Sequence, residues 1–265
     1  MSLLRVAMVQ VEPVTGDVPG NVATVAAQVE RAAAQGARLV VLPEAVTTGY
    51  DPGAFAGALP PSADLSWLDR LQEAVERTGT TVVLNTPLDR GVHRTLTDLV
   101  LSPGTAPWVA YDKQHLYPPE RPLFAAGGNG TSFELDGVAV ALSVCYDAEF
   151  PEHAAAAAAD GAHLYVNSGA YFPGGAHKRN LRHAARAVDN GLYVGFAGLV
   201  GSAAGFIGGT AVYDPTGRVV ERLEEGTGMV VADVDTDAVD AARRDEQMLL
   251  DRRPDLGERR VRTLA

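Results

Sequence analysis

Cysteine and long apolar runs are what this sequence has least of. Its 265 residues include a single cysteine, Cys145, which cannot form a disulfide within the chain, so we expect a reducing compartment. No stretch reaches the roughly 18 uninterrupted apolar residues of a membrane span. The opening segment MSLLRVAMVQVEP has neither the charged start nor the long apolar core of a secretory signal. These features predict a cytoplasmic protein.

Positive charge is also scarce. Lysine and arginine number 22 against 33 aspartate and glutamate residues, for a net charge of −11. This balance argues against nucleic acid and against a membrane surface as partners. Hydrophobic residues make up 46% and charged residues 21% of the chain, a composition typical of a globular protein with a sizeable core. No stretch has the composition of a linker, so we expect one domain over residues 1–265 with a charged tail from about residue 251.

Apolar runs alternate with segments of helical periodicity in the first half of the chain. Helices capped by Asn21 and by Asp64 are expected between three buried strands, at residues 4–11, 38–42 and 80–84. This alternation is typical of parallel strands covered by helices. Two further runs, at 95–101 and 108–111, flank a Ser-Pro-Gly turn and predict a hairpin, so we expect a mixed sheet.

The second half repeats this organisation. Strands are expected at residues 138–144, 162–166, 192–197, 205–213, 218–223 and 229–234. A helix is expected over 177–190, with its apolar residues inward: Leu181, Ala184, Ala185 and Val188. The second half thus also holds a sheet. Two sheets and outer helices in one chain indicate a layered α/β sandwich.

Cys145 lies at the end of the apolar run VAVALSV, which reads as a buried strand. Pro151 is well placed to begin a helix that continues through six alanines. A strand, a turn and a helix N-terminus around a thiol are expected to lower its pKa and to supply backbone N–H donors. A lone cysteine is equally often a small buried hydrophobe, so the stretch by itself leaves nucleophile and core filler open.

A nucleophilic cysteine needs a base and a group that stabilises an oxyanion. Glu44 follows the buried run Val40-Val41-Leu42-Pro43, where burial is expected to raise its pKa toward that of a general base. Lys113 follows another strand and could stabilise a thiolate or an oxyanion. The alternatives are a solvated loop glutamate and a lysine paired with Asp112.

Three segments together resemble the signatures of the nitrilase superfamily of carbon-nitrogen hydrolases. They are LPEAVTTGY around Glu44, YDKQHLYPPE around Lys113 and CYDAEFPE around Cys145, in the order of that superfamily. The segment VAMVQ near the start resembles the first strand of that superfamily. RAVDNG, GGT and DPTG in the second half and Asp251-Arg252-Arg253-Pro254 in the tail resemble its later elements. The resemblance covers nearly the whole chain.

The resemblance implies a four-layer αββα sandwich with two mixed β-sheets and outer helices, and a Glu-Lys-Cys triad. Glu44 would be the general base, Lys113 the oxyanion-stabilising cation and Cys145 the nucleophile. Glu120 falls where the family places a second glutamate that orients the lysine and the substrate, and the backbone N–H of Tyr146 would complete the oxyanion hole. No metal or organic cofactor is implied, and the six histidines show no metal-binding spacing.

Several residues are expected to contact the substrate. Glu149 stands where many members carry arginine, and it could select a positively charged substrate or pair with Arg121. Asp189 replaces the usual glutamate of its helix motif and is expected to be structural. The segment 166–172 follows a strand and is expected to line the pocket. The substrate-contact residues expected from these segments are Tyr50, Tyr146, Glu149, Asn167, Ser168 and Tyr171.

The preferred function is hydrolysis of a small linear amide through a cysteine thioester, with release of ammonia and a carboxylic acid. Hydrolysis of an N-carbamoyl amine or amino acid and hydrolysis of a nitrile are alternatives within the family. A catalytically silent binding protein is the alternative of another class. Because family members commonly pair, the resemblance also implies a homodimer or a larger homo-oligomer.

Overall fold

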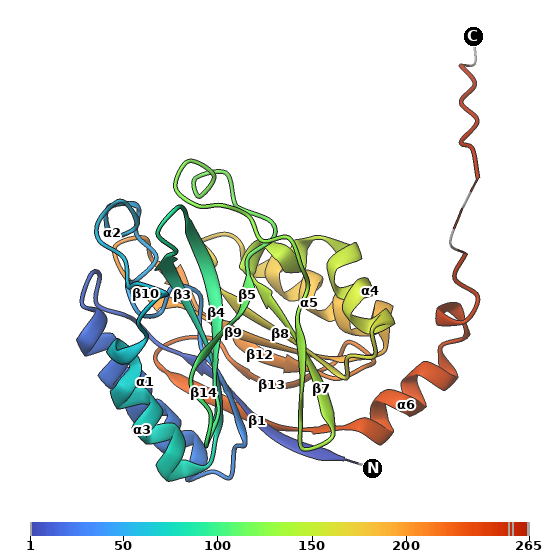
Figure 1. Cartoon of the computed structure of the whole chain (residues 1–265). Helices are drawn as coiled ribbons and strands as arrows, with labels where there is room; N and C mark the ends of the chain where they lie inside the picture. Colours follow the sequence, from blue (N-terminus) through green and yellow to red (C-terminus); the bar gives the residue numbers. More distant parts are fainter. Residues whose placement is uncertain (1, 254, 256, 264–265) are drawn as a thin grey trace.

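The computed structural model describes residues 2–253, 255 and 257–263. Two large sheets lie face to face, and helices cover the outer face of each (Figure 1). Each large sheet has six strands, and a two-stranded ribbon lies apart from them. This confirms the four-layer αββα sandwich with two mixed sheets that the sequence predicts.

The first sheet combines both ends of the chain. Its strand order is β14 (Gly228–Asp235), β1 (Leu3–Gln10), β2 (Leu39–Val41), β3 (Thr81–Asp89), β4 (Arg94–Leu101) and β5 (Trp108–Asp112). Strands β1, β2 and β3 are parallel, whereas β14, β4 and β5 each pair antiparallel with a neighbour. Since β4 and β5 reverse direction in turn, β5 runs the same way as β2.

The second sheet is built from the middle of the chain. Its order is β13 (Val219–Leu223), β12 (Thr210–Tyr213), β9 (Tyr193–Gly198), β8 (Leu164–Gly169), β7 (Val138–Val144) and β6 (Ser132–Leu135). Strands β7, β8 and β9 are parallel, and the other pairs are antiparallel. The separate ribbon joins β10 (Val200–Gly201) to β11 (Phe206–Ile207).

The helices form the two outer layers. α1 (Val18–Ala33) and α3 (Asp69–Thr78) pack on the first sheet, and α4 (Pro151–Ala159) and α5 (Ala176–Asn190) pack on the second. The remaining helical segments are α2 (Pro52–Ala56), α6 (Thr236–Asp245) and the 3₁₀ turns η1 (Ser66–Leu68), η2 (Cys145–Glu149) and η3 (Gln247–Leu249).

Successive side chains of the central strands point to opposite faces of the sheet, so each strand packs against two layers. In β1, Val6 and Met8 face the second sheet, whereas Ala7 and Val9 face the helices α1 and α3. A strand that is apolar at every position can bury both faces, which is why these runs show no polar alternation. Each such large aliphatic side chain contributes about 1.5–3 kcal/mol on burial.

Both expected helix caps are wrong. α1 begins at Val18 because Asp17 accepts a hydrogen bond from the Gly20 N–H and a proline occupies the first turn. Asn21 lies inside this helix and donates to the carbonyls of Val14 and Thr47. The Asp64 carboxylate accepts from the Ser66 N–H and starts the turn η1 rather than the helix α3.

The inward face of α5 is polar rather than apolar, which corrects the prediction for residues 177–190. Leu181 is 60% exposed, and its expected companions Ala184, Ala185 and Val188 are only partly buried. The buried side chains of α5 include Arg179, His183 and Arg186. These polar groups find partners beneath the helix, since Arg179 donates to the carbonyl of Gly208 and His183 bonds to Asn167.

The last strand and the tail complete the fold. β14 pairs antiparallel with β1 along its whole length, so it belongs to the first sheet. Its position in the second half of the chain had suggested that it would join the second sheet.

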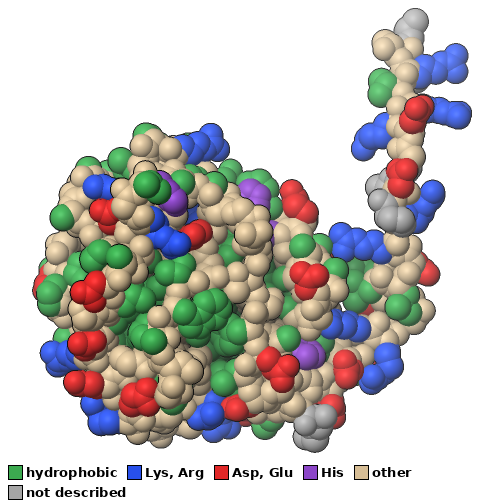
Figure 2. Space-filling view, viewed as in Figure 1, with side chains coloured by type: hydrophobic (Ala, Val, Ile, Leu, Met, Phe, Trp, Pro, Cys, Tyr) green, Lys and Arg blue, Asp and Glu red, His purple; other side chains and the backbone are tan. Residues whose placement is uncertain are grey.

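Beyond η3 the described residues form no helix or strand, and the tail leads away from the sandwich with charged side chains along it (Figures 1 and 2). The Pro254 of the expected tail motif lies outside the described residues. Within the described chain, no helix is long and apolar enough to cross a membrane.

Candidate active site

Glu44, Lys113 and Cys145 each follow a strand at the same end of the sandwich. Glu44 comes shortly after β2 and Lys113 directly after β5, and these two strands of the first sheet run the same way. Cys145 directly follows β7 of the second sheet and begins the turn η2. The carboxyl ends of parallel strands are the usual place for a ligand site in such sheets.

Lys113 is the centre of a buried polar cluster. Its side chain is fully buried, and Nζ donates to Glu44 Oε1 at 2.7 Å and to Glu120 Oε1 at 2.8 Å. Glu120 also accepts from the Tyr50 hydroxyl at 2.7 Å and from the Tyr117 N–H at 2.8 Å. Glu120 is therefore held from three sides, and it holds the ammonium of Lys113 in turn.

Glu44 keeps one carboxylate oxygen available. Its Oε2 is buried and has no hydrogen-bond partner among the described residues, while the Cys145 thiol interacts with the same carboxylate. Burial raises the pKa of Glu44 to about 7, against the lowering effect of the Lys113 charge. A carboxylate with this pKa can both take and return a proton near neutral pH.

The groups around Lys113 keep its ammonium protonated. Burial alone would lower the pKa of this ammonium, but the negative charges of Glu44 and Glu120 help to raise it above its usual value. Lys113 is therefore a permanent cation at neutral pH. Such a charge in a buried site, where the effective dielectric constant is low, stabilises a developing anion far better than it would in water.

Cys145 differs from the sequence-based expectation in one respect. Burial of the thiol, together with the nearby charge of Glu44, raises its pKa well above the ordinary value, so the predicted lowering is wrong. The Lys113 charge and a contact to the Ala170 carbonyl at 3.6 Å only partly oppose this. Cys145 also has a φ of 43°, in the left-handed region that residues with side chains rarely adopt. The thiol is therefore held protonated at a strained turn, beside its base.

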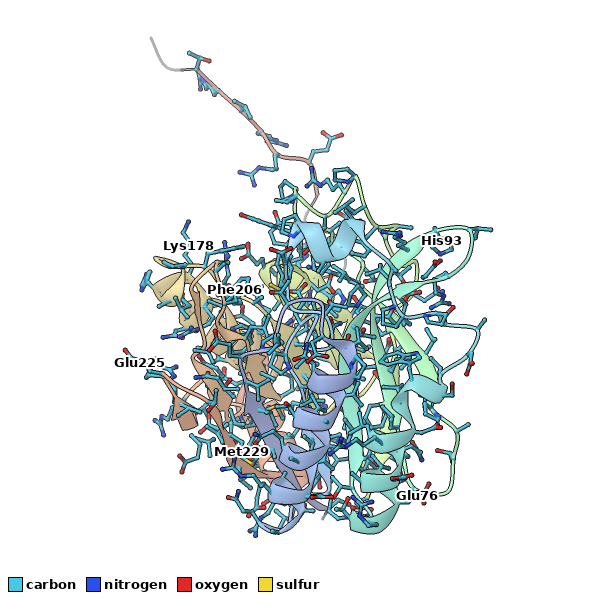
Figure 3. All side chains as sticks on the ribbon, turned by 90° about the vertical axis from the view of Figure 1, so that its left-hand side faces the viewer. Glu76, His93, Lys178, Phe206, Glu225 and Met229 are labelled. Atoms are coloured by element: carbon cyan, nitrogen blue, oxygen red, sulfur yellow. The ribbon has the colours of Figure 1, made fainter. Side chains whose placement is uncertain are left out.

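A cavity of about 300 Å³ opens onto Cys145. Aromatic walls surround it, formed by Tyr50, Tyr117, Tyr146, Tyr171 and Phe172. Figure 3 shows Lys178, on α5 at this cavity, at the same end of the molecule as Phe206, which packs against Tyr50. Aromatic and apolar walls with a few polar groups are typical of a site for a small molecule.

The expected substrate contacts divide into two groups. Tyr50, Tyr146, Glu149 and Tyr171 line the cavity, but Asn167 and Ser168 do not. Both of the latter are fully buried, and Asn167 donates to the Ser143 hydroxyl and to the Cys145 carbonyl. They are neighbours in β8, so their side chains point to opposite faces of the second sheet.

Tyr171, which lines the cavity, has a hydroxyl with no hydrogen-bond partner within the part of the chain that the structure describes. This hydroxyl is buried. Burial and the neighbouring Cys145 raise its pKa well above the usual value, so it stays protonated and can donate.

Glu149 pairs with Arg182 on α5 and not with Arg121. Arg121 instead donates to the Leu116 carbonyl at 3.3 Å. Burial raises the pKa of Glu149, and the charge of Arg182 opposes that shift. Lys178 lines the same cavity one helical turn before Arg182 and has no hydrogen-bond or ion-pair partner in the described chain.

Sequence reasoning missed Arg182 and Lys178 as parts of the site. Their spacing of four residues on a predicted helix was a usable signal, because residues four apart share one face. The prediction assigned the inward residues of this helix to Leu181, Ala184, Ala185 and Val188 and gave no role to Lys178 or Arg182. No group of three or more His, Cys, Asp or Glu side chains in the described ranges could hold a metal ion.

A model of the carbon-nitrogen hydrolase family matches residues 5–244. The chain belongs to this family. Among its relatives is an (R)-stereoselective amidase of Pseudomonas, 34% identical over 81% of this chain and 79% of the relative. An omega-amidase of Danio rerio is 30% identical over 97% of each chain.

Solved structures of nitrilase-superfamily amidases share this fold. A variant of the amidase from Nesterenkonia sp. AN1, in complex with butyramide, aligns with a TM-score of 0.82 and 28% identity over 92% of this chain and 95% of that one. Another variant of the same amidase shows the result of Michael addition of acrylamide at the active-site cysteine, with a TM-score of 0.80, 28% identity, and coverage of 91% of this chain and 97% of that one.

Proposed function

We propose that this carbon-nitrogen hydrolase is an amidase that cleaves a small linear amide through a thioester on Cys145. The observation that carries the proposal is the buried contact of Lys113 with Glu44 and Glu120, at the base of a cavity that Cys145 lines. It places a base, a permanent cation and a thiol together where water is largely excluded. These are the parts that acyl transfer requires.

Acylation begins with a proton transfer from the Cys145 thiol to Glu44. As the proton leaves, Sγ forms a bond to the amide carbon, and the carbonyl oxygen becomes an oxyanion. Lys113 and the backbone N–H of Tyr146 stabilise this charge. The carbon-nitrogen bond then breaks, Glu44 returns the proton to the leaving nitrogen, and ammonia departs from the thioester.

Deacylation uses the same groups in reverse order. A water molecule gives a proton to Glu44 and attacks the thioester carbon, and Lys113 again stabilises the oxyanion. The carbon-sulfur bond breaks, and Cys145 regains its proton as the carboxylic acid leaves. The sum is amide plus water giving acid plus ammonia. Two moderate barriers replace one high barrier, and no cofactor takes part.

The charges of the cavity favour a substrate that is neutral or anionic at the end remote from the reacting amide. Glu149, which sequence reasoning considered as a selector of cationic substrates, is already paired with Arg182. Lys178 is a second cation near that carboxylate, so at this wall of the cavity two positive charges face the single negative charge of Glu149. A carboxylate at the far end of the amide would complement the additional positive charge, and an ammonium would be repelled.

Ammonia release from a substrate panel tests this proposal. The panel holds small aliphatic amides, ω-amino amides, monoamides of dicarboxylic acids, carbamoyl amino acids and nitriles, with Cys145→Ala as the control. We expect release from an amide, abolished in the variant, with monoamides of dicarboxylic acids better than ω-amino amides. If neither the wild type nor Cys145→Ala releases ammonia from any compound of the panel, a binding protein is favoured. Ammonia release only from carbamoyl compounds or nitriles would change the assigned substrate class.

We further propose a single domain over residues 1–265, a cytoplasmic location and a homodimer or larger assembly. One apolar core joins residues of both sheets, which supports a single domain. The exposed Leu181 on α5, and the exposed Val219 and Val220 on the edge strand β13, support an assembly, since apolar side chains of this size gain from burial. The single cysteine and the acidic composition support the location.

A further inference from the structure

The groups of the proposed site come from two different sheets. Glu44 and Lys113 extend from the first sheet, whereas Cys145 extends from the second. Between the sheets lies an apolar core, including Leu142 and Val144 of β7. Apolar contacts are not directional, so packing alone does not set the position of the thiol relative to the lysine to a fraction of an ångström. Directional hydrogen bonds can.

Asp147 makes such bonds across the gap. Its carboxylate is fully buried in the turn η2, two residues after Cys145. Oδ1 accepts from the N–H of His115 at 2.8 Å and bonds to His115 Nδ1 at 2.9 Å. Oδ2 accepts from the Tyr111 hydroxyl at 2.7 Å and from the N–H of Val144 at 3.0 Å.

These contacts lie immediately beside the site on both sides. Tyr111 and His115 flank Lys113 by two residues in each direction, and Val144 directly precedes Cys145. The ring of His115 also stacks on Phe150, just after η2, with centroids 3.8 Å apart. Asp147 therefore joins the lysine-bearing segment to the cysteine-bearing turn through one side chain.

A buried carboxylate is costly unless hydrogen bonds satisfy it, so its presence calls for a reason. Asp147 has bonds to both oxygens, and it does not line the cavity that Cys145 faces. It is thus placed to act on the site through its neighbours and not on the substrate.

We propose that Asp147 is a positioning residue that clamps the Lys113 segment to the Cys145 turn. This inference rests on the proposed catalytic function of those two residues. The Tyr111 hydroxyl extends the clamp to His153, which bonds in turn to the Tyr165 hydroxyl, with distances of 2.9 Å for each contact. Tyr111 touches Asp147 directly, whereas Tyr165 does not.

Asp147→Asn tests the clamp. The amide that replaces one oxygen cannot accept from the backbone N–H it faces, so the turn shifts while the cavity lining stays. A misplacement of about 1 Å at the reacting atoms lowers the rate by about 10²-fold. We expect kcat to fall by about this factor, with KM changed by less than about threefold and circular dichroism unchanged. A folded variant with the wild-type kcat would overturn the proposal.

Two tyrosine variants give a matched comparison that does not depend on the folding of Asp147→Asn. Both remove one buried hydroxyl from the same network, and only one of these hydroxyls bonds to Asp147. We expect Tyr111→Phe to lower kcat by about tenfold, the equivalent of one hydrogen bond to a charged group, and Tyr165→Phe to change it by less than about twofold. Equal effects of the two would contradict the clamp.

Alkylation of Cys145 by iodoacetamide separates this proposal from the proposed function. Its pH midpoint depends on the distance of the thiol from Glu44 and Lys113. We expect Asp147→Asn and Tyr111→Phe to move the midpoint by at least about 0.5 unit, and Tyr165→Phe to leave it in place. If the wild type hydrolyses no amide but these midpoints move, the function fails and the clamp stands. Unmoved midpoints in both folded variants overturn the clamp itself.

Discussion

At the scale of single residues, the chemistry depends on how burial distributes protons among three groups. Glu44 has a pKa of about 7, the Cys145 thiol has a raised pKa, and Lys113 stays charged. The resting site thus holds a neutral thiol next to a base that is half ionised at neutral pH. This arrangement favours proton transfer from the thiol to Glu44 after the substrate binds. It does not favour a thiolate that is already present in the free enzyme.

The pH dependence of kcat/KM follows from these values. The base must be unprotonated, so activity requires a pH above the pKa of Glu44. We expect kcat/KM to fall about tenfold per pH unit below an apparent pKa near 7 and to level off above it, because Lys113 does not lose its proton there. Initial rates at substrate concentrations well below KM, from pH 5 to 9, measure this. A profile that stays flat down to pH 5 would exclude Glu44 as the titrating base.

At the scale of elements, α5 shows how a helix can be held by polar contacts. Arg179 is almost fully buried, donates to the Gly208 carbonyl and lies over the ring of Phe196. His183 is buried beside it, and burial lowers its pKa to about 3, so it is neutral in the fold. The helix carries Lys178 and Arg182 on the neighbouring face, so the fit of Arg179 also sets the cavity charges.

Gly209 controls that fit. Its φ is 80°, and a Cβ there would lie 1.9 Å from the Arg179 guanidinium. We expect Gly209→Ala to lower the free energy of unfolding by about 2–4 kcal/mol, through backbone strain and displacement of Arg179. Gly91 is the matched control, since its φ is 83° and a Cβ there meets nothing within 4 Å. We expect Gly91→Ala to cost only about 1 kcal/mol. Denaturant unfolding of both variants measures the difference, and equal losses would exclude the clash.

At the scale of the whole molecule, the sandwich leaves apolar side chains on its outer surface. Leu181 on α5 is 60% exposed, while the same helix buries arginine and histidine. An exposed leucine on a helix that turns its polar residues inward is available for contact with a second surface. Because many homo-oligomers are symmetric, the same face of a second copy is the partner we propose.

Leu181→Arg tests this assembly. A buried charge in an apolar contact is costly, so we expect the variant to be smaller than the wild type in size-exclusion chromatography with light scattering. Val92→Arg is the control, because Val92 is 91% exposed in the turn between β3 and β4. A wild-type protein that is already monomeric, or an assembly that Leu181→Arg leaves intact, would contradict the proposed interface.

Much of the fold could be predicted from sequence because its signals are local. The strands before Glu44, Lys113 and Cys145 are apolar runs with clear ends, and most of the predicted strands and helices are present within a few residues. The N-cap of α1 was assigned to the wrong residue because Asp17 and Asn21 are both good cap residues, and only the position of the proline in the first turn decides between them. Conformational preference acts over a few residues, so the sequence alone suffices for it.

The sequence by itself determined which strands form, where they end and which chemical groups stand at those ends. Only the tertiary structure decided which of these groups meet. It pairs Glu149 with Arg182 and not Arg121, removes Asn167 and Ser168 from the cavity, and turns Leu181 outward. It also raises the pKa of Cys145, because burial of the thiol and the charge of Glu44, from another strand, act through space. Burial and Coulomb interactions depend on distances between segments far apart in the chain, and no local pattern carries that information.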